Sequence, residues 1–168
     1  LQYYCGFRIG ETLALTKSDI DFVGKSIFIS KTYDRRNKKD IITEPKTKNS
    51  IRRVYLPDSL CNELKRYVDG LYEYPEDARI FPVIIRAVET KMHRQMEKAG
   101  MTNIIRVHDL RHSAASFYLS QGADMYAIQR LLGHASIEET IRTYSHFSIE
   151  QDRQIANIVN RLNQKGGD

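Results

Sequence analysis

The segment from residue 108 to residue 144 constrains the fold more than any other, because glycines divide it into short helices. Gly122 and Gly133 each follow a stretch with apolar residues at helical spacing, the place where a glycine commonly ends a helix. Capping signals, at Asp124 and at the Ser136–Glu139 pair, precede the second and third stretches. The segment therefore predicts three short helices joined by tight connections.

Upstream, the hydrophobic pattern predicts further helices and a small sheet. Two short helices are expected within residues 1–24, on either side of Gly6. The pattern then alternates, which indicates three short antiparallel strands. These strands contain Ile27 and Ile29, Ile41 and Thr43, and residues 53–56. Longer helices are expected at 57–71 and 85–99, and an amphipathic helix at 148–163. We therefore predict the α+β class, mostly helical with a small three-stranded antiparallel sheet.

The composition fits one globular domain spanning residues 1–168, with 41% apolar and 28% charged residues. No membrane-spanning stretch or leader is visible, so the cytoplasm is the expected compartment. Cys5 and Cys61 lie in apolar stretches without a close partner, as expected of buried free thiols. Leu1 stands inside an apolar pattern, and we interpret the sequence as a fragment of a longer protein.

Basic residues are concentrated between residues 31 and 53. The whole chain carries a net charge of +5, whereas this segment has nine basic against three acidic residues, a net +6. The basic residues are Lys31, Arg35, Arg36, Lys38, Lys39, Lys46, Lys48, Arg52 and Arg53. Polar loops at 34–40 and 46–50 would present many of them to a nucleic-acid backbone. Protection of sheet edges against aggregation is the simpler explanation, but nine basic residues exceed that need.

Several polar residues near helix ends are candidates for chemistry. Arg8 lies in the turn before a new helix, where backbone N–H groups and a guanidinium together suit a phosphate. A surface pair with Glu11 would explain Arg8 equally well. His108 and Arg111 are neighbours at i, i+3 on the first helix of the segment described above. Each residue taken alone is also compatible with a structural role.

The combination of motifs is more specific than any single residue. It resembles the tyrosine recombinases over nearly the whole chain, and among them it is most similar to integrases of phages and conjugative transposons. The motifs that carry the resemblance, in the order and approximate spacing of that family, are Gly6-Phe7-Arg8-Ile9-Gly10-Glu11, Pro45-Lys46-Thr47, His108-Asp109-Leu110-Arg111-His112, Leu131-Leu132-Gly133-His134 and Thr143-Tyr144.

The resemblance implies the catalytic domain of an enzyme that exchanges DNA strands, and the residues themselves suit that chemistry. A phosphodiester under attack gains negative charge, which Arg8 and Arg111 could bind from opposite sides. Tyr144 would attack and form a 3′-phosphotyrosyl link, and His108 is the expected acceptor of its proton.

The remaining site residues come from two other motifs. The departing 5′-oxygen needs a proton, for which Lys46 matches the family position and Lys48 is the competitor. His134 matches the position that hydrogen-bonds the scissile phosphate. Glu11 is expected to brace Arg8, and Asp109 to cap the helix of Arg111. DNA-backbone contacts are expected from Lys31, Arg35, Arg36, Lys38, Lys39, Lys48 and Arg52.

The implied reaction needs no metal and no nucleotide cofactor, because the phosphotyrosine keeps the energy of the broken bond. The expected partner is double-stranded DNA, bound by a homotetramer of the full-length protein. The family also implies a separate DNA-clamping domain before residue 1, and a C-terminal helix that can dock on a neighbouring subunit. No membrane partner is expected.

Three alternatives remain open. A metal-dependent hydrolase could use His108, His112, His134 and His146, although Asp109 follows His108 where the zinc-protease helix has Glu. A topoisomerase-like enzyme would relax DNA with the same residues. A catalytically inactive relative would only bind DNA, but all six family positions hold competent residues.

Overall fold

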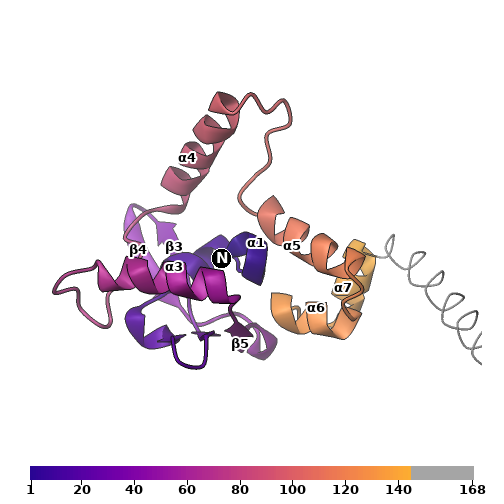
Figure 1. Ribbon diagram of the computed structural model, residues 1–168, viewed down its shortest axis with the longest axis horizontal. Helices are drawn as coiled ribbons and strands as arrows, with labels where there is room; N and C mark the ends of the chain where they lie inside the picture. Colours follow the sequence, from indigo (N-terminus) through magenta and orange to yellow (C-terminus); the bar gives the residue numbers. More distant parts are fainter. Residues whose placement is uncertain (145–168) are drawn as a thin grey trace, which may run out of the picture.

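The computed structural model describes residues 1–144, in which helices surround two small antiparallel sheets. The predicted class, α+β and largely helical with a small antiparallel sheet, is confirmed. Figure 1 shows α1–α4 and the strands on one side, and α5, α6 and α7 grouped on the other. The helix expected at 148–163 and His146 lie outside the described residues.

Two short helices open the chain, as predicted. They are α1 (Gln2–Cys5) and α2 (Ile9–Ala14), and Gly6 ends the first in the left-handed conformation with φ of 63°. Helix α1 packs against α5 of the other group, and Tyr118 Oη on α5 donates a hydrogen bond of 2.7 Å to the carbonyl of Tyr4. The first turn of the chain therefore joins the two sides of the molecule.

The three-stranded sheet has a different composition from the one predicted. Its strands are β1 (Ile20–Asp21), β2 (Ser26–Ile29) and β5 (Arg52–Tyr55), in the order β1-β2-β5. A 3-10 turn at Lys17–Asp19 precedes β1, and another at Lys48–Ser50 precedes β5. The residues around Ile41, which we expected in this sheet, belong to a second one.

That second sheet is a hairpin of β3 (Thr32–Arg36) and β4 (Lys39–Thr43). Arg36 pairs with Lys39 across a two-residue turn, in which Asn37 and Lys38 have φ of 50° and 62°. Positive φ at both central residues is the geometry that matches the twist of paired strands. The predicted loop at 34–40 is therefore mostly strand, and the prediction was wrong there because this turn contains no glycine.

One hydrophobic core lies between the three-stranded sheet and α3 (Asp58–Asp69). Ile27 and Ile29 of β2 contribute its sheet side, and Leu64 and Val68 contribute its helix side. Cys5 and Cys61 are buried free thiols, as predicted. Helix α4 (Ile85–Lys98) follows. No described helix is both long and apolar enough to cross a lipid bilayer.

The second group of helices matches the predicted boundaries closely. It comprises α5 (Asp109–Ser120), α6 (Met125–Leu132) and α7 (Ile137–Tyr144). The Asp124 carboxylate accepts hydrogen bonds from the backbone N–H groups of Tyr126 and Ala127, at 2.9 and 3.1 Å, which confirms the predicted cap. Gly133 ends α6 with φ of 64°. Leu119, Ile128 and Leu132 form the core of this group together with Tyr144.

A glycine at position 133 is favoured for two reasons, its positive φ and its close contacts, and a pair of alanine substitutions can distinguish them. Gly122 and Gly133 both have positive φ, 86° and 64°, so alanine at either position incurs the left-handed penalty of about 1–2 kcal/mol. A Cβ at Gly133 would also lie 3.0 Å from Arg52 Nη1 and from the carbonyl oxygen of Asn49, whereas nothing lies within 4 Å at Gly122.

We therefore expect Gly133→Ala to reduce the free energy of unfolding by clearly more than Gly122→Ala, measured by urea denaturation. Equal losses in the two variants would show that the close approach to Arg52 and Asn49 has no energetic effect.

Candidate active site

Glu11 holds two arginines near the start of α2. The Arg8 backbone N–H and Nη1 donate to the Glu11 carboxylate at 2.8 and 3.0 Å, and Arg52 donates to both carboxylate oxygens at 3.0 and 2.9 Å. Glu11 is only 2% exposed, which by itself would raise its pKa, but the hydrogen bonds and charges of Arg52 and Arg8 bring the pKa below its usual value. The expected support of Arg8 by Glu11 is present, and Arg8 remains half-exposed.

The structure corrects the expectation for Arg52, which we placed on the DNA-facing surface. Its side chain is buried, and besides Glu11 it donates from Nε to the carbonyl of Leu131 at 2.8 Å. Residues of β5 alternate between buried and exposed, and Arg52 falls on the buried face. Arg52 therefore ties β5 to α2 and to the end of α6, and its guanidinium is engaged in contacts within the protein.

Arg111 joins three segments of the chain. It lies on α5, is 2% exposed, and donates to the carbonyls of Gly6 and Leu132. Burial lowers its pKa to about 9, with a smaller contribution from the nearby positive charge of Arg8, so Arg111 remains protonated at neutral pH. Among residues 1–144 no carboxylate forms a salt bridge with Arg111. Its positive charge is therefore held by carbonyl dipoles and is not cancelled by an anion.

Arg8 and Lys46 line one cavity of about 360 Å³. Gly133 and Ala135, the two neighbours of His134, form part of its wall together with Glu139. Lys46 is exposed and forms no ion pair with any carboxylate in the described part of the chain. Lys48 does not line this cavity, since it begins the 3-10 turn that leads to β5. The geometry therefore favours Lys46 over Lys48 as the lysine of the site.

His134 lies directly after α6 and is buried. Its Nδ1 is 2.8 Å from the hydroxyl oxygen of Thr140, and its Nε2 is 3.7 Å from a carboxylate oxygen of Glu139. Burial lowers the pKa of His134 to about 4, although the Glu139 charge acts in the opposite direction. His134 is therefore a neutral imidazole at physiological pH. It lines a second cavity, of about 710 Å³, together with Asn49 and Arg52, whereas its neighbours Gly133 and Ala135 line the cavity of Arg8 and Lys46.

The hydroxyl of Tyr144 contacts a residue other than the one we expected. His112 Nδ1 lies 2.9 Å from Tyr144 Oη, and the His108 ring packs edge-on against the His112 ring at 5.0 Å. Tyr144 is 2% exposed, and burial raises the pKa of its hydroxyl. The pKa of His108 is lowered by partial burial and by the neighbouring His112 and Arg111. The i, i+4 spacing of the two histidines places them on one helix face, which was the available signal for His112.

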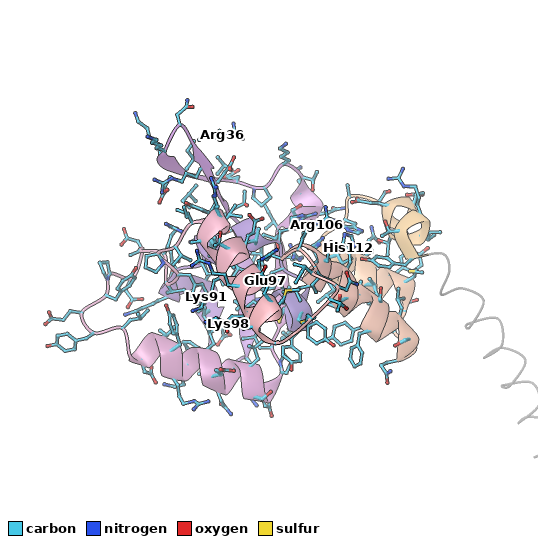
Figure 2. All side chains as sticks on the ribbon, turned by 90° about the horizontal axis from the view of Figure 1, so that it is seen from above. Arg36, Lys91, Glu97, Lys98, Arg106 and His112 are labelled. Atoms are coloured by element: carbon cyan, nitrogen blue, oxygen red, sulfur yellow. The ribbon has the colours of Figure 1, made fainter. Side chains whose placement is uncertain are left out.

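The remaining basic residues occupy the β3–β4 hairpin and its surroundings. Figure 2 shows Arg36 near the outer end of this hairpin, away from the helices. Arg36 pairs with Asp34 at 2.8 Å, and Arg35 with Asp40 at 2.9 Å. Lys31 is half-buried and pairs with Asp19 at 2.8 Å, whereas Lys38 and Lys39 are exposed at the turn, and Lys48 is exposed before β5. Apart from Arg52 and the half-buried Lys31, the predicted DNA-contacting residues are thus exposed.

The helix cap expected from Asp109 is not observed, because the N-cap residue of α5 is His108, whose side chain forms no capping hydrogen bond. Asp109 instead binds Arg106, which precedes the helix. The Asp109 carboxylate accepts from the backbone N–H of Arg106 at 2.8 Å and pairs with the Arg106 guanidinium at 2.9 Å, which holds the pKa of Asp109 at about 2. No group of three potential metal-ligating side chains occurs within residues 1–144.

The fold agrees with comparisons to known proteins. The model of the phage integrase family matches residues 1–151, which is most of the chain. This chain belongs to the phage integrase family.

Individual relatives support the same assignment. The ICEBs1 integrase of Bacillus subtilis (strain 168) is 31% identical over 173 residues, covering 95% of this chain and 47% of that protein. Tyrosine recombinase XerC of Chlamydia muridarum (strain MoPn / Nigg) is 33% identical over 159 residues, covering 92% of this chain and 47% of that protein. The chain therefore spans about half the length of these relatives.

Solved structures share the fold. The Tn1549 transposon integrase, solved in complex with circular intermediate DNA, superimposes with a TM-score of 0.80 at 21% identity, over 94% of this chain and 57% of that one. XerA recombinase has a TM-score of 0.63 at 27% identity, over 90% of this chain and 54% of that one. The fold expected from the resemblance, that of a tyrosine-recombinase catalytic domain, is confirmed.

The contact between His112 and Tyr144 predicts a measurable loss of stability. In His112→Leu the buried tyrosine hydroxyl loses its partner, which should reduce the free energy of unfolding by about 1–3 kcal/mol. His112→Asn should reduce the free energy of unfolding by less, because the asparagine amide can form a hydrogen bond with the Tyr144 hydroxyl in place of Nδ1. The exposed His93 on α4 provides the control, and His93→Leu should change stability by no more than about 0.5 kcal/mol. If His112→Leu and His112→Asn unfold at the same urea concentration, the hydrogen bond contributes nothing.

Proposed function

We propose that this chain is the catalytic part of a site-specific DNA recombinase, which cleaves and rejoins DNA through a 3′-phosphotyrosyl intermediate. The observation that carries the proposal is the convergence of cationic groups on one cavity. Arg8 and Lys46 line it, the two neighbours of His134 form part of its wall, and the charge of Arg8 lowers the pKa of the nearby buried Arg111. A cavity that collects positive charge around neutral hydrogen-bonding groups suits a phosphodiester.

The proposed cleavage step assigns one role to each group. Tyr144 Oη forms a bond to phosphorus while the bond from phosphorus to the 5′-oxygen breaks. Arg8 and Arg111 stabilise the negative charge that develops on the non-bridging oxygens, and the ammonium of Lys46 protonates the departing 5′-oxygen. The number of phosphate ester bonds is unchanged, so a 5′-hydroxyl from another strand can reverse the step without metal or nucleotide.

The proton of the Tyr144 hydroxyl has two candidate acceptors. His108 occupies the position that the family resemblance assigns to this role, but His112 is the histidine in hydrogen-bond contact with Tyr144. Tyr144 is 2% exposed, so attack on a phosphate in the cavity requires its side chain to move outward. His108, exposed at the start of α5, is placed to receive the proton after such a movement.

Double-stranded DNA is the proposed partner. The Tn1549 transposon integrase, which shares the fold, was solved in complex with DNA. In the present chain the exposed cations of the β3–β4 hairpin, Arg35, Arg36, Lys38 and Lys39, form a basic extension that suits contacts with the phosphate backbone. The full-length protein is proposed to act in the cytoplasm, as a homotetramer on DNA, with a preceding DNA-clamping domain and a C-terminal helix that docks on a neighbour.

A suicide substrate tests the nucleophile. The protein is incubated with a nicked duplex that carries the recombination site of its parent element, and covalent protein–DNA adducts are separated on a denaturing gel. Tyr144→Phe should abolish the adduct and leave DNA binding within about threefold of the wild type, because only the attacking oxygen is removed. The control is Tyr126→Phe, at an exposed tyrosine on α6, which should form adducts normally. Adducts that persist in Tyr144→Phe would assign the attack to another residue.

A sulfur substitution tests the general acid. Lys46→Ala should slow cleavage of ordinary DNA by about 10²–10⁴-fold, the usual contribution of a positioned proton donor. The defect should largely disappear when sulfur replaces the departing 5′-oxygen, because a thiolate, with a thiol pKa near 8.5, leaves without a proton. Lys48→Ala is the matched control and should show only a small defect that sulfur does not correct. If the sulfur substrate restored the cleavage rate of Lys48→Ala and not that of Lys46→Ala, Lys48 would be the general acid.

A further inference from the structure

Thr140 contacts a site residue but has no role in the chemistry described so far. It lies on α7, is 0% exposed, and its hydroxyl oxygen is 2.8 Å from Nδ1 of His134. The neutral imidazole of His134 carries one proton, on either Nδ1 or Nε2, and the two forms differ in what they present to the cavity. The position of that proton therefore decides whether His134 can donate a hydrogen bond to a phosphate.

The Thr140 hydroxyl favours one direction for this hydrogen bond. Within residues 1–144, Nδ1 of His134 is the only hydrogen-bond partner of Thr140 Oγ1. If Nδ1 carried the proton and donated it, the buried hydroxyl proton would be left without an acceptor, which is unfavourable. If the hydroxyl donates to a bare Nδ1, both groups are satisfied by one bond.

The opposite edge of the ring favours the same form. His134 Nε2 is 3.7 Å from a carboxylate oxygen of Glu139, which lines the cavity with Arg8 and Lys46. A lone pair on Nε2 would face the negative carboxylate and be repelled, whereas an N–H would be attracted to it. The two edges of the ring are thus consistent with one arrangement, in which Nδ1 accepts from Thr140 and Nε2–H points towards Glu139.

We propose that Thr140 is a positioning residue, which holds His134 as the Nε2–H form so that this histidine acts as a neutral hydrogen-bond donor to the scissile phosphate. The phosphate role of His134 rests on the function proposed above, but the position of the proton does not. The Glu139 carboxylate lies 3.7 Å from Nε2, beyond hydrogen-bond distance, so the Nε2–H is left for an incoming phosphate oxygen to accept. His134 in this form cannot accept a proton at Nε2, so it is not a base towards the DNA.

The position of Thr140 connects this arrangement to the nucleophile. Thr140 and Tyr144 are one turn apart on α7, at i, i+4, and both are buried. One helix face therefore carries the group that orients His134 and the group that attacks. Outward movement of α7 would displace both together, so the donor and the nucleophile are positioned by the same element.

The position of the proton can be measured without DNA. In ¹⁵N-histidine-labelled wild-type protein, His134 should show a pyridine-type shift at Nδ1 and a pyrrole-type shift at Nε2. Thr140→Ser keeps the hydroxyl and should preserve this pattern, whereas Thr140→Val should give a mixture of the two forms or a changed Nδ1 shift. A pyrrole-type Nδ1 in the wild type would overturn the proposal, and this result does not depend on any variant folding.

Adduct formation on the suicide substrate then tests the consequence for cleavage. Thr140→Val should slow adduct formation by about 10–100-fold, the usual effect of removing a group that orients an active-site ligand, and Thr140→Ser should remain close to the wild type. The matched control is Thr143→Val, because within the described part of the chain the exposed Thr143 hydroxyl on the same helix donates only to the carbonyl of Glu139, at 2.8 Å. Equal rates in Thr140→Val and Thr143→Val would overturn the positioning role.

The two measurements separate the two proposals. Absence of adducts in the wild type, with the Nε2–H form present, would contradict the recombinase function and leave the assignment of the proton intact. Adducts in the wild type with the Nδ1–H form present would support the function and contradict the role of Thr140.

Discussion

The contact on which the site depends most is the buried guanidinium of Arg111 with the carbonyls of Gly6 and Leu132. These two carbonyls come from segments more than a hundred residues apart in the chain, and the guanidinium comes from a third. Burying a charge without a carboxylate partner is unfavourable, so the surrounding backbone has to supply oriented dipoles. The same contact that joins the two sides of the molecule therefore leaves a positive charge available at their junction, beside Arg8.

Glu11 compensates for the accumulation of positive charge. It accepts from both Arg8 and Arg52, and so one buried carboxylate stabilises two of the three guanidiniums near the junction. Arg52 donates two further hydrogen bonds to the backbone carbonyls of Ser50 and Leu131, and Ser50 lines the cavity. Three guanidiniums and one carboxylate leave a net positive charge at the junction. Hydrogen bonds hold all of these side chains in place. A site organised in this way needs little rearrangement to bind an anion.

The sequence predicted those parts of the structure that depend on local signals. The turn at Gly6, the cap at Asp124 and the end of α6 at Gly133 are each determined within a few residues, and all three were correct. The β3–β4 hairpin was missed because Asn37 and Lys38 adopt positive φ without a glycine. The burial of Arg52 and the contact between His112 and Tyr144 depend on tertiary packing. Alternation shows that β5 has two faces, but it does not show which face is covered.

Both carbonyls that hold Arg111 belong to helix ends in which a glycine adopts the left-handed conformation. Gly6 supplies one carbonyl itself, and Gly133 directly follows Leu132, which supplies the other. The conformation of the two glycines thus directs the carbonyl dipoles of Gly6 and Leu132 at the Arg111 guanidinium. The backbone conformation at Gly6 and Gly133 therefore sets the electrostatic potential of the junction as well as the ends of the two helices.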